Sequence, residues 1–286
     1  MTMRRGVNGY LIYGVQAAKG DVVVPGTVLP YVANLSVDPI SNVTGVSAAG
    51  SRSFVEIEEG MYGVEWSLDF PKIQGNAAAL TFMNFSVATG APEVLPWFSF
   101  EYGDDRGTWI VKDCKVDTRT LEGGSGEAEW LTGSMSGFGG LITAGAGSGM
   151  AYIDTPGLAM HEAVHSAYEL SRFRSTTSNG LKMQPVIAGP ATVRTGREWD
   201  YMPEGSFTVE GEYGMYNTSG IDLNADCIAT WAHVMTWTNK CTPYNGVTLT
   251  WAGQKAQRNG LVIPGDDSDI EWTVPWLATG EALAAV

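Results

Sequence analysis

Charge is scarce in this 286-residue sequence, where charged residues make up 17% of the chain against about 25% in a typical soluble domain. Basic residues are the scarcer kind, because 17 Lys and Arg stand against 31 Asp and Glu and leave a formal net charge of −14. A protein that grips nucleic acid through its phosphates needs a basic face, and the few basic residues here are scattered along the chain. The composition therefore argues against a phosphate-gripping surface and indicates a lightly charged surface that meets other protein.

Cysteines and long apolar runs are also few. The three cysteines stand far apart at Cys114, Cys227 and Cys241, and an odd number at wide spacing argues against a disulfide framework or a zinc ribbon. Buried free thiols in a reducing compartment are favoured. No stretch reaches the roughly 18 apolar residues of a membrane span, and no signal-peptide run follows the first residues. We expect a product that is made or assembled in the cytosol, without a membrane.

Glycine and aromatic residues are plentiful, with 36 Gly and 10 Trp, and this mixture favours short strands and tight turns over helices. The segment 63–70 alternates strictly: one face carries Val64, Trp66, Leu68 and Phe70, and the other carries Glu65, Ser67 and Asp69. Period-two alternation with one apolar face predicts a half-buried antiparallel strand. The segment 206–212 repeats the pattern, with Phe207 and Val209 on one face and Thr208, Glu210 and Glu212 on the other.

Each of these strands precedes a stretch that begins with Asn-Ala and favours a short helix, at 76–83 and at 224–235, because Asn is a good N-cap. Further strands follow. Residues 97–102 and 108–113 predict a hairpin, and 114–121 with 127–135 predict a second pair. The chain closes with strands expected at 247–251 and 270–274.

The order of strand, short helix and three further strands thus occurs twice, which indicates an internal duplication. The Gly/Ser/Ala tract 137–149 is the expected flexible connection between the copies. We predict a mostly β protein of two tandem domains, 1–144 and 145–286, each with one short helix.

Three stretches resemble the tail tube proteins of long-tailed bacteriophages (major tail proteins), in particular the two-domain type. They are the entry strand at 59–70, the meander from Trp97 to Met135, and the C-terminal segment 263–274 with 279–283. The segment 170–180 is similar to the strand that opens a tail tube domain. The resemblance covers most of the chain and lies in strand order and turn placement.

The resemblance implies β-sandwich or barrel-like domains whose sheets join those of neighbours into a continuous barrel, which removes free strand edges. It implies a structural virion protein and not an enzyme, with no cofactor: trimeric (pseudo-hexameric) or hexameric rings stack into a tail tube, a conduit for DNA ejection. DNA passes through without specific binding. The expected partners are tape-measure, baseplate and terminator proteins, and the expected location is the virion tail, assembled in the host cytoplasm.

The polar faces of the two entry strands are the expected lining of the lumen, because their opposite faces must pack the core. Carboxylates there repel phosphate, so DNA slides without adhering, over about 8 Å at physiological salt. The predicted lumen-lining residues are Glu65, Asp69, Glu210 and Glu212. An outer-wall position, where they serve only solubility, is the alternative.

His161-Glu-Ala-Val-His165 matches the H-E-x-x-H motif of zinc peptidases. On a helix His161 and His165 share a face and can bind zinc, while Glu162 activates its water. Tyr168 and Ser171 stand where one class of these enzymes has Gly and a third His. A zinc-dependent metallopeptidase is thus one alternative, and no metal site is the preferred interpretation. A different virion or adhesin β module is the other.

Overall fold

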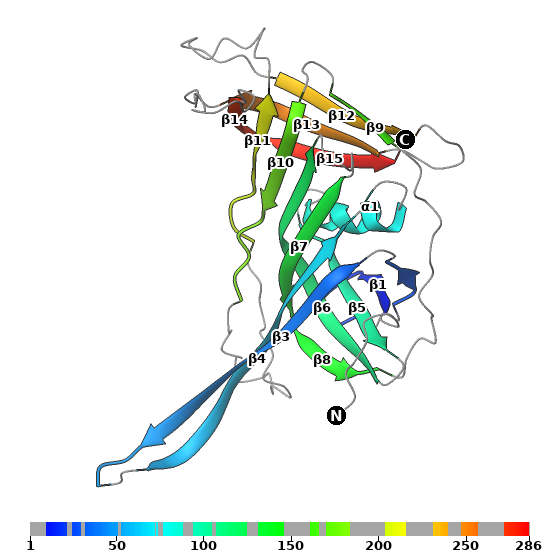
Figure 1. The fold of residues 1–286 in the computed structure, drawn as a ribbon. Coiled ribbons are helices and arrows are strands. Elements are labelled where there is room, and N and C mark those ends of the chain that lie inside the picture. Colours follow the sequence, from blue (N-terminus) through cyan, green and yellow to red (C-terminus); the bar gives the residue numbers. More distant parts are fainter. Residues whose placement is uncertain are drawn as a thin grey trace, which may run out of the picture.

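A computed structural model of the protein describes residues 10–21, 25–29, 32–50, 53–71, 73, 77–87, 94–104, 107–124, 131–145, 161–165, 170–183, 204–215, 231–239, 247–256 and 272–285. The described structure is mostly β: fifteen antiparallel strands are connected by hydrogen bonds into one sheet system, with one short α-helix. The pairings divide this system into three parts, called here the long, lower and upper sheets (Figure 1).

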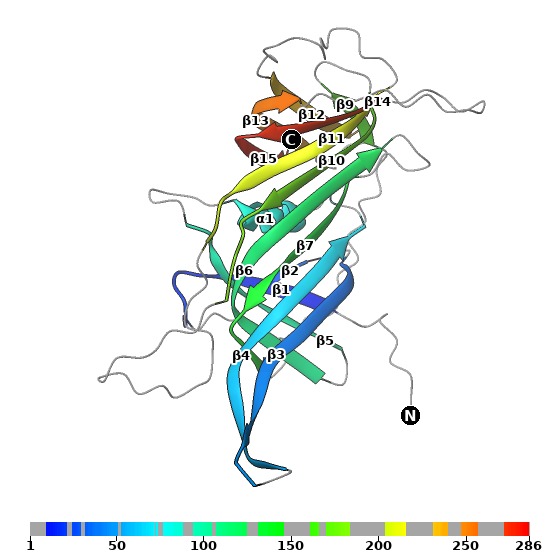
Figure 2. The same ribbon diagram turned by 90° about the vertical axis from the view of Figure 1, so that its left-hand side faces the viewer.

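The long sheet runs the height of the molecule. Its order is β3 (Ala33–Ser47), β4 (Phe54–Phe70), β7 (Thr132–Gly139), the second part of β6 (Gly107–Gly124), β10 (Leu170–Ser178), β11 (Thr208–Met215), β14 (Trp272–Ala278) and the end of β13 (Val247–Ala256). Figure 2 shows this sheet from its open side, with the other elements behind it.

The two smaller sheets lie behind the long sheet. The lower sheet contains β2 (Thr27–Val28), β1 (Tyr10–Gln16), β5 (Trp97–Asp104), the first part of β6 and β8 (Leu141–Ala144). The upper sheet contains β9 (His161–His165), β12 (Trp231–Asn239), the first part of β13 and β15 (Gly280–Ala285). Helix α1 (Ala77–Met83) and the 3₁₀ turn η2 (Asn84–Ser86) sit between them on the same side (Figure 1).

Two long strands cross from a smaller sheet into the long sheet, and each does so at a left-handed residue. In β6 that residue is Asp113, with φ 55°, and in β13 it is Gly253, with φ 61°. A non-glycine residue in this region needs local support. The Asp113 carboxylate receives it from the side-chain amide of Gln16 at 2.9 Å and the backbone N–H of Gly20 at 2.7 Å.

The strand pairings of the first half recur in the second half. β1 pairs with β5, β5 with β6, β6 with β7 and β8, β7 with β4, and β4 with β3. β9 pairs with β12, β12 with β13, β13 with β14 and β15, β14 with β11, and β11 with β10. The chain therefore contains the same topology twice, and we call β1–β8 the first repeat and β9–β15 the second repeat.

Hydrogen bonds fix which residues of the two repeats are equivalent. Just past the corner of β6, the Gly140 N–H donates to the carbonyl of Lys112 at 2.9 Å, and the Thr279 N–H donates to the carbonyl of Ala252 at the same distance. Following the registers outward from these bonds makes Gly137 equivalent to Trp276 and Trp66 equivalent to Gly211. Each repeat thus has one cross-strand Trp–Gly pair, but the tryptophan stands on opposite strands.

The core consists of two aromatic clusters behind the long sheet. In the lower one, Trp66 lies edge-on to Phe98 and Phe100, with ring centroids 5.6 and 5.8 Å apart. In the upper one, Trp251 contacts Trp276 at 5.4 Å and Tyr213 at 6.0 Å. Edge-to-face packing of this kind adds to the burial of apolar area, so each smaller sheet is fastened to the long sheet by its own aromatic cluster.

The expected alternation is confirmed in the first entry strand and only from Val209 onward in the second. Val64, Trp66, Leu68 and Phe70 are buried, while Glu65 and Ser67 are exposed. The first helix and both hairpin pairings through β6 are also confirmed. Phe207, expected on the apolar face of the second entry strand, precedes β11 and is exposed.

Two expectations are wrong. Trp231–Met235, predicted as the end of a second helix, belongs to strand β12, which takes the place that β5 has in the first repeat; 224–230 lie outside the described residues. The tract 137–149, predicted as a flexible connection, begins inside β7 and continues through β8, and 146–149 are not described. Its glycines serve close packing: a Cβ on Gly137 lies 2.0 Å from the Lys115 carbonyl oxygen and 2.7 Å from the Trp66 ring.

The two repeats share the long sheet, because β6 of the first repeat pairs with β10 of the second. The structure thus displays a repeated topology in one sheet and not two separated domains. The division into 1–144 and 145–286 stays a prediction, as does the assignment of each half to the tail tube fold.

The lower aromatic cluster gives a test of the packing. Trp66→Ala should lower the free energy of unfolding by about 3–5 kcal/mol, because it removes a fully buried ring from between two sheets. Urea unfolding followed by circular dichroism measures this loss. Trp109→Ala, which truncates a partly exposed ring on β6, is the matched control and should cost clearly less; equal losses would contradict the packing described.

Candidate functional site: the polar face of the long sheet

The open side of the long sheet, which faces the viewer in Figure 2, carries mostly polar side chains by the register of its strands, and we call it the polar face. Phe138 and Leu277 are apolar members of the same face. Strand alternation produces it, since every second residue of these strands points away from the aromatic core. Serines and threonines form its neutral part: Ser36, Ser67, Thr120, Thr132, Ser134, Ser136, Thr176 and Thr208. This part of the face offers hydroxyl groups to water.

The four carboxylates that the sequence singled out all lie on this face. Glu65 and Asp69 come from β4, and Glu210 and Glu212 come from β11, on the side opposite the buried Trp66, Leu68, Val209 and Tyr213. The equivalence of Trp66 and Gly211 makes Glu65 and Glu210 the same position in the two repeats. The structure thus brings these residues to one surface.

Sequence reasoning missed several acidic neighbours, because their strands lack clean alternation. Asp38 on β3 stands directly opposite Glu65 on β4. Asp117, at a bulge in β6, lines the same shallow depression as these two residues. Glu122 extends the acidic set along β6. Three strands of the first repeat therefore add carboxylates to one part of the polar face.

The described basic side chains of the polar face are mostly neutralised by its own acids. Arg172 on β10 forms an ion pair with Glu212 at 2.6 Å, and Arg174 pairs with Glu122 at 3.2 Å. These pairs are exposed and stabilise the fold little. Their main effect is electrostatic, because they neutralise two arginines of the face. Within the described part of the chain, Glu65, Glu210 and Lys255 form no ion pair.

Both ends of the long sheet present a strand edge. Among the described residues, β3 pairs with β4 alone, and Trp272–Pro275 of β14 pair with β11 alone. A long unpaired edge exposes a row of backbone N–H and C=O groups that readily adds another strand. Pro39, which lacks an N–H, lies within β3 and agrees with an edge position.

The junction between the repeats shows how such edges join. β6 and β10 pair antiparallel from Thr118–Ser178 to Gly124–Arg172 without a register shift. On the polar face, the hydroxyls of Thr120 and Thr176 are 3.3 Å apart. On the core side, Phe173 packs over Gly123, whose absent Cβ makes room for the ring.

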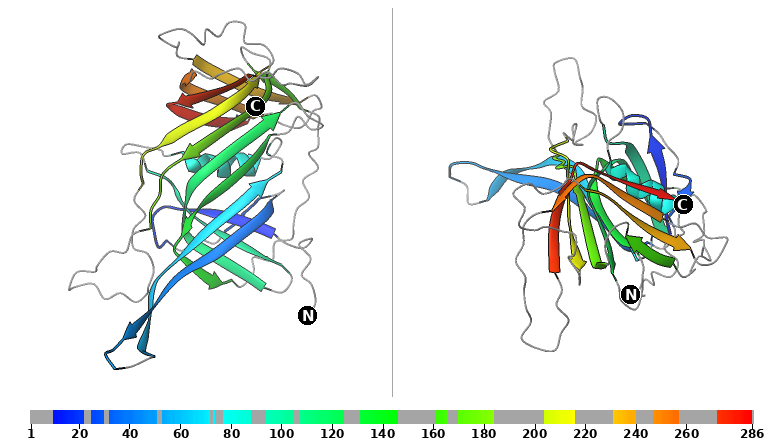
Figure 3. Two further views of the ribbon diagram at one scale, coloured as in Figure 1. Left: turned by 60° about the vertical axis from the view of Figure 1, so that its left-hand side comes forward. Right: turned by 90° about the horizontal axis from the view of Figure 1, so that it is seen from above.

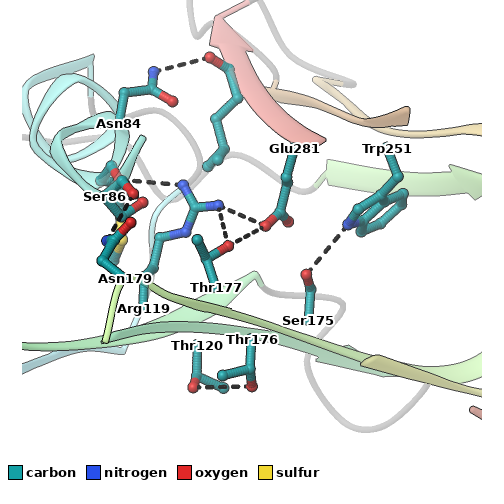
Figure 4. A network of polar contacts seen from close by, with 12 residues as sticks. Asn84, Ser86, Arg119, Thr120, Ser175, Thr176, Thr177, Asn179, Trp251 and Glu281 are labelled. Atoms are coloured by element: carbon teal, nitrogen blue, oxygen red, sulfur yellow. Dashed lines mark hydrogen bonds and ion pairs between the residues drawn. The ribbon is translucent and has the colours of Figure 1, made fainter. Parts of the chain in front are cut away.

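A buried ion pair closes this junction on the core side (Figure 4). The guanidinium of Arg119 on β6 contacts the Glu281 carboxylate of β15 at 2.5 Å and the Thr177 hydroxyl of β10 at 3.1 Å. It also donates to the carbonyl of Met83 at the end of α1. Both charged side chains are fully buried, so each depends on the other for compensation of its charge.

The H-E-x-x-H segment is strand β9, not a helix. It pairs with β12 from Met235–His165 to Asn239–His161 and takes the place in the second repeat that β1 has in the first. A strand rises about 3.3 Å per residue, so positions 161 and 165 lie about 13 Å apart, against about 6 Å on a helix. The arrangement that the zinc motif requires is therefore not formed here.

Burial perturbs the acidity of several described groups in or against the core, including Tyr13 and Tyr102, whose pKa values it raises. Burial raises the pKa of the Cys114 thiol well above its usual value, and the charge of Asp113 adds to the effect. Burial also raises the pKa of Tyr213, against the hydrogen bond from Gln254, which lowers it. Cys114 and Tyr213 stay protonated at ordinary pH, which makes them packing residues and not nucleophiles.

Among the described residues no group of three or more His, Cys, Asp or Glu has the arrangement to hold a metal ion. The single described α-helix falls short of the length and apolarity that crossing a bilayer requires. Protein-family models give no match to this chain, and curated proteins give none either. A function must consequently be argued from the sequence and from the geometry of the polar face and its edges.

The strand conformation of β9 predicts that purified protein lacks stoichiometric zinc after dialysis, and that Glu162→Gln leaves its properties unchanged. Elemental analysis of the dialysed protein measures the metal, with His233→Ala as a control for incidental binding by histidine. One zinc per chain that is lost in His161→Ala would contradict the expectation.

Proposed function

We propose that this chain is the building block of a bacteriophage tail tube, a ring-forming structural protein whose polar face lines the channel for DNA. The observation that carries the proposal is the junction of β6 with β10. There, the edge of one repeat pairs with the edge of an equivalent repeat, without a register shift over seven residue pairs. The same pairing repeated between chains builds a ring.

The edges left over at the two ends of the long sheet are the equivalents of those already joined. β3 is the counterpart of β10, and the β13 end of the sheet is the counterpart of β6. Pairing β3 of one chain with the β13 end of the next repeats the internal junction. A head-to-tail contact of this kind closes into a ring when its rotation permits, and closure removes both free edges of the long sheet.

The width of the long sheet bears on the copy number. Each chain contributes eight strands, so three chains supply 24. With strands about 4.8 Å apart and tilted about 45°, a 24-stranded barrel is roughly 50 Å across at the backbone and leaves a bore of roughly 40 Å. Six chains double the strand number and give a bore of roughly 90 Å or more. A duplex fits the trimer, so we favour three chains per ring with pseudo-sixfold symmetry.

The hairpin of β3 and β4 supports stacking of such rings. It extends well beyond the body of the molecule along the strand direction (Figures 1 and 3). Because barrel strands run obliquely to the barrel axis, this hairpin reaches past the rim of its own ring. Its described end exposes Phe54 and Val46, which are 62% and 40% accessible. Apolar side chains at the end of a projecting hairpin suit a contact with another copy of the chain.

The charge of the polar face agrees with a channel lining. Unpaired carboxylates repel the phosphates of DNA, while the arginines of the face are held by Glu212 and Glu122. Hydroxyl groups between them keep the wall hydrated. DNA then passes without being held, as a conduit for ejection requires.

The edge strand β3 offers a test of ring formation. Pro39 shows that its backbone N side faces away from β4, and Val37 has the same orientation because the register has no shift between Ser36 and Ser41. Val37→Pro should therefore remove a donor needed by the neighbouring chain and weaken assembly by about tenfold or more. Light scattering and negative-stain microscopy against protein concentration measure the loss.

Val37→Ala is the matched control, because it truncates the same partly buried side chain but keeps the N–H. It should form rings at wild-type concentrations. Rings that form equally well with Val37→Pro would refute the proposed edge, and a wild-type protein that stays monomeric at millimolar concentration would refute the ring itself.

The equivalent positions Glu65 and Glu210 test the channel. Replacing both by Lys should make assembled tubes bind linear duplex DNA in low salt, and the affinity should fall steeply as salt rises. Tubes of wild-type protein and of the neutral control Glu65→Gln/Glu210→Gln should bind little. Cosedimentation with fluorescent DNA measures binding.

Closed circular DNA distinguishes the channel from the outer wall, because a circle cannot thread into a tube of this bore. The lysine variant should retain linear duplex and protect it from nuclease, while releasing the circle. Equal binding of both forms would place the polar face outside.

A further inference from the structure

The chain carries two similar strand edges, and only one of them joins β6. β3 and β10 occupy equivalent places, each paired with the entry strand of its own repeat. The two edges offer the same backbone hydrogen bonds except at Pro39, which lacks the N–H that Thr177 has at the equivalent place on β10. In a concentrated solution of this protein, a β3 edge from a second copy competes for β6. One missing donor discriminates weakly between the two edges, and a charged side chain on β6 can discriminate more strongly.

Arg119 is placed to do so. Its guanidinium lies on the core side of β6 with no exposed surface, and two of its three described acceptors come from the second repeat: the Glu281 carboxylate at 2.5 Å and the Thr177 hydroxyl at 3.1 Å. Thr177 itself donates to Glu281 at 2.8 Å. The arriving edge thus brings both groups that compensate the buried charge (Figure 4).

The first repeat lacks both groups at the equivalent positions. Val37 pairs with Trp66, and Ser175 pairs with Gly211, the equivalent of Trp66. Two residues further along each strand, Pro39 therefore stands where the second repeat has Thr177. Val111 and Trp251 are equivalent positions in the two repeats, and they pair with Ile142 and Glu281. Ile142 therefore stands where the second repeat has Glu281. A proline and an isoleucine offer no side-chain acceptor to a guanidinium.

We propose that Arg119 decides which edge pairs with β6. It admits the second repeat's edge, β10 with β15, and rejects the first repeat's edge, β3 with β8, from a second copy of the chain. The wrong edge buries the guanidinium against apolar groups, and an uncompensated buried charge is strongly unfavourable. This is specificity by exclusion of the wrong partner.

The consequence is an order of repeats. A first repeat therefore never follows a first repeat at β6 in any sheet that these chains build, and β6 is always followed by a second repeat. The inference depends on the repeated topology and the buried ion pair, and it holds whether or not the assembled sheet is a phage tube.

Engineered cysteines on the polar face report which edge has paired. Thr120 of β6 stands beside Thr176 of β10, with hydroxyls 3.3 Å apart, and Asp38 is the equivalent of Thr176 on β3. One chain, with Cys227 and Cys241 replaced by Ser, carries Thr120→Cys. A second chain, distinguished by a tag, carries either Thr176→Cys or Asp38→Cys. The two are unfolded together, refolded as a mixture and oxidised, and interchain disulfides are measured on a non-reducing gel.

With Arg119 intact, the Asp38→Cys chain should crosslink at less than about one tenth of the yield of the Thr176→Cys chain, because one uncompensated buried charge disfavours the pairing by more than this factor. In the background Arg119→Met/Glu281→Met the two yields should become similar. Replacing a buried ion pair by apolar residues of similar volume is often neutral for stability, and circular dichroism checks that this background refolds.

A yield ratio that stays low in the double variant, or that is already near one with Arg119 intact, overturns the proposal. If the double variant does not refold, the reciprocal graft decides: Pro39→Thr/Ile142→Glu gives the first repeat's edge the two missing acceptors while Arg119 remains. Pro39→Ala restores only the backbone N–H and is the matched control, whose ratio should stay low. The ratio of the graft should rise toward one, and a ratio no higher than that of the control overturns the proposal. The ring junction does not bring Thr120 beside Asp38, so a failure to form rings leaves this readout intact.

Discussion

The pairing of β6 with strands on both of its sides is the constraint on which the rest of the structure depends. Its first part belongs to the lower sheet, its second part to the long sheet, and its far edge receives the second repeat. The bend at Asp113 separates these roles. Without that bend the aromatic cluster around Trp66 has no second layer, and without the far edge the two repeats have no common sheet. One strand therefore organises core, sheet and repeat junction.

The sequence predicted those parts of the fold in which local pattern and tertiary environment agree. The alternation from Val64 to Phe70 predicted a half-buried strand correctly, because one face of this strand packs on aromatic residues and the other is exposed to water. The residues at 231–235 were misread as helix, because spacing within a short apolar run does not tell a helix from a buried strand. The glycines at 137–139 suggested a linker. In the structure, glycine is needed at these positions because Trp66 and the β6 backbone lie too close to leave room for a side chain.

The candidate site divides in the same way. The acids of β4 and β11 follow from alternation, whereas Asp38 and Asp117 come from an irregular strand and a bulge, whose facing no periodic pattern gives. The partnership of Arg119 with Glu281 spans 162 positions of the chain and is invisible to any local pattern. The duplication itself is also hidden at the level of residues, since Trp66 and Gly137 in one repeat answer to Gly211 and Trp276 in the other. The combined side-chain volume of the Trp–Gly pair is the same in both repeats, although the residue at each of the two positions differs.

The long hairpin belongs to the first repeat alone: β3 and β4 have 15 and 17 residues, while β10 and β11 have 9 and 8. In the proposed ring of three chains, a channel wall that is nearly sixfold would therefore be only threefold at its rim. Successive rings would then have few relative rotations in which every projecting hairpin contacts the same surface of the next ring. The angular offset between rings, and with it the helical pitch of the whole filament, would be set by this asymmetry between two otherwise equivalent halves.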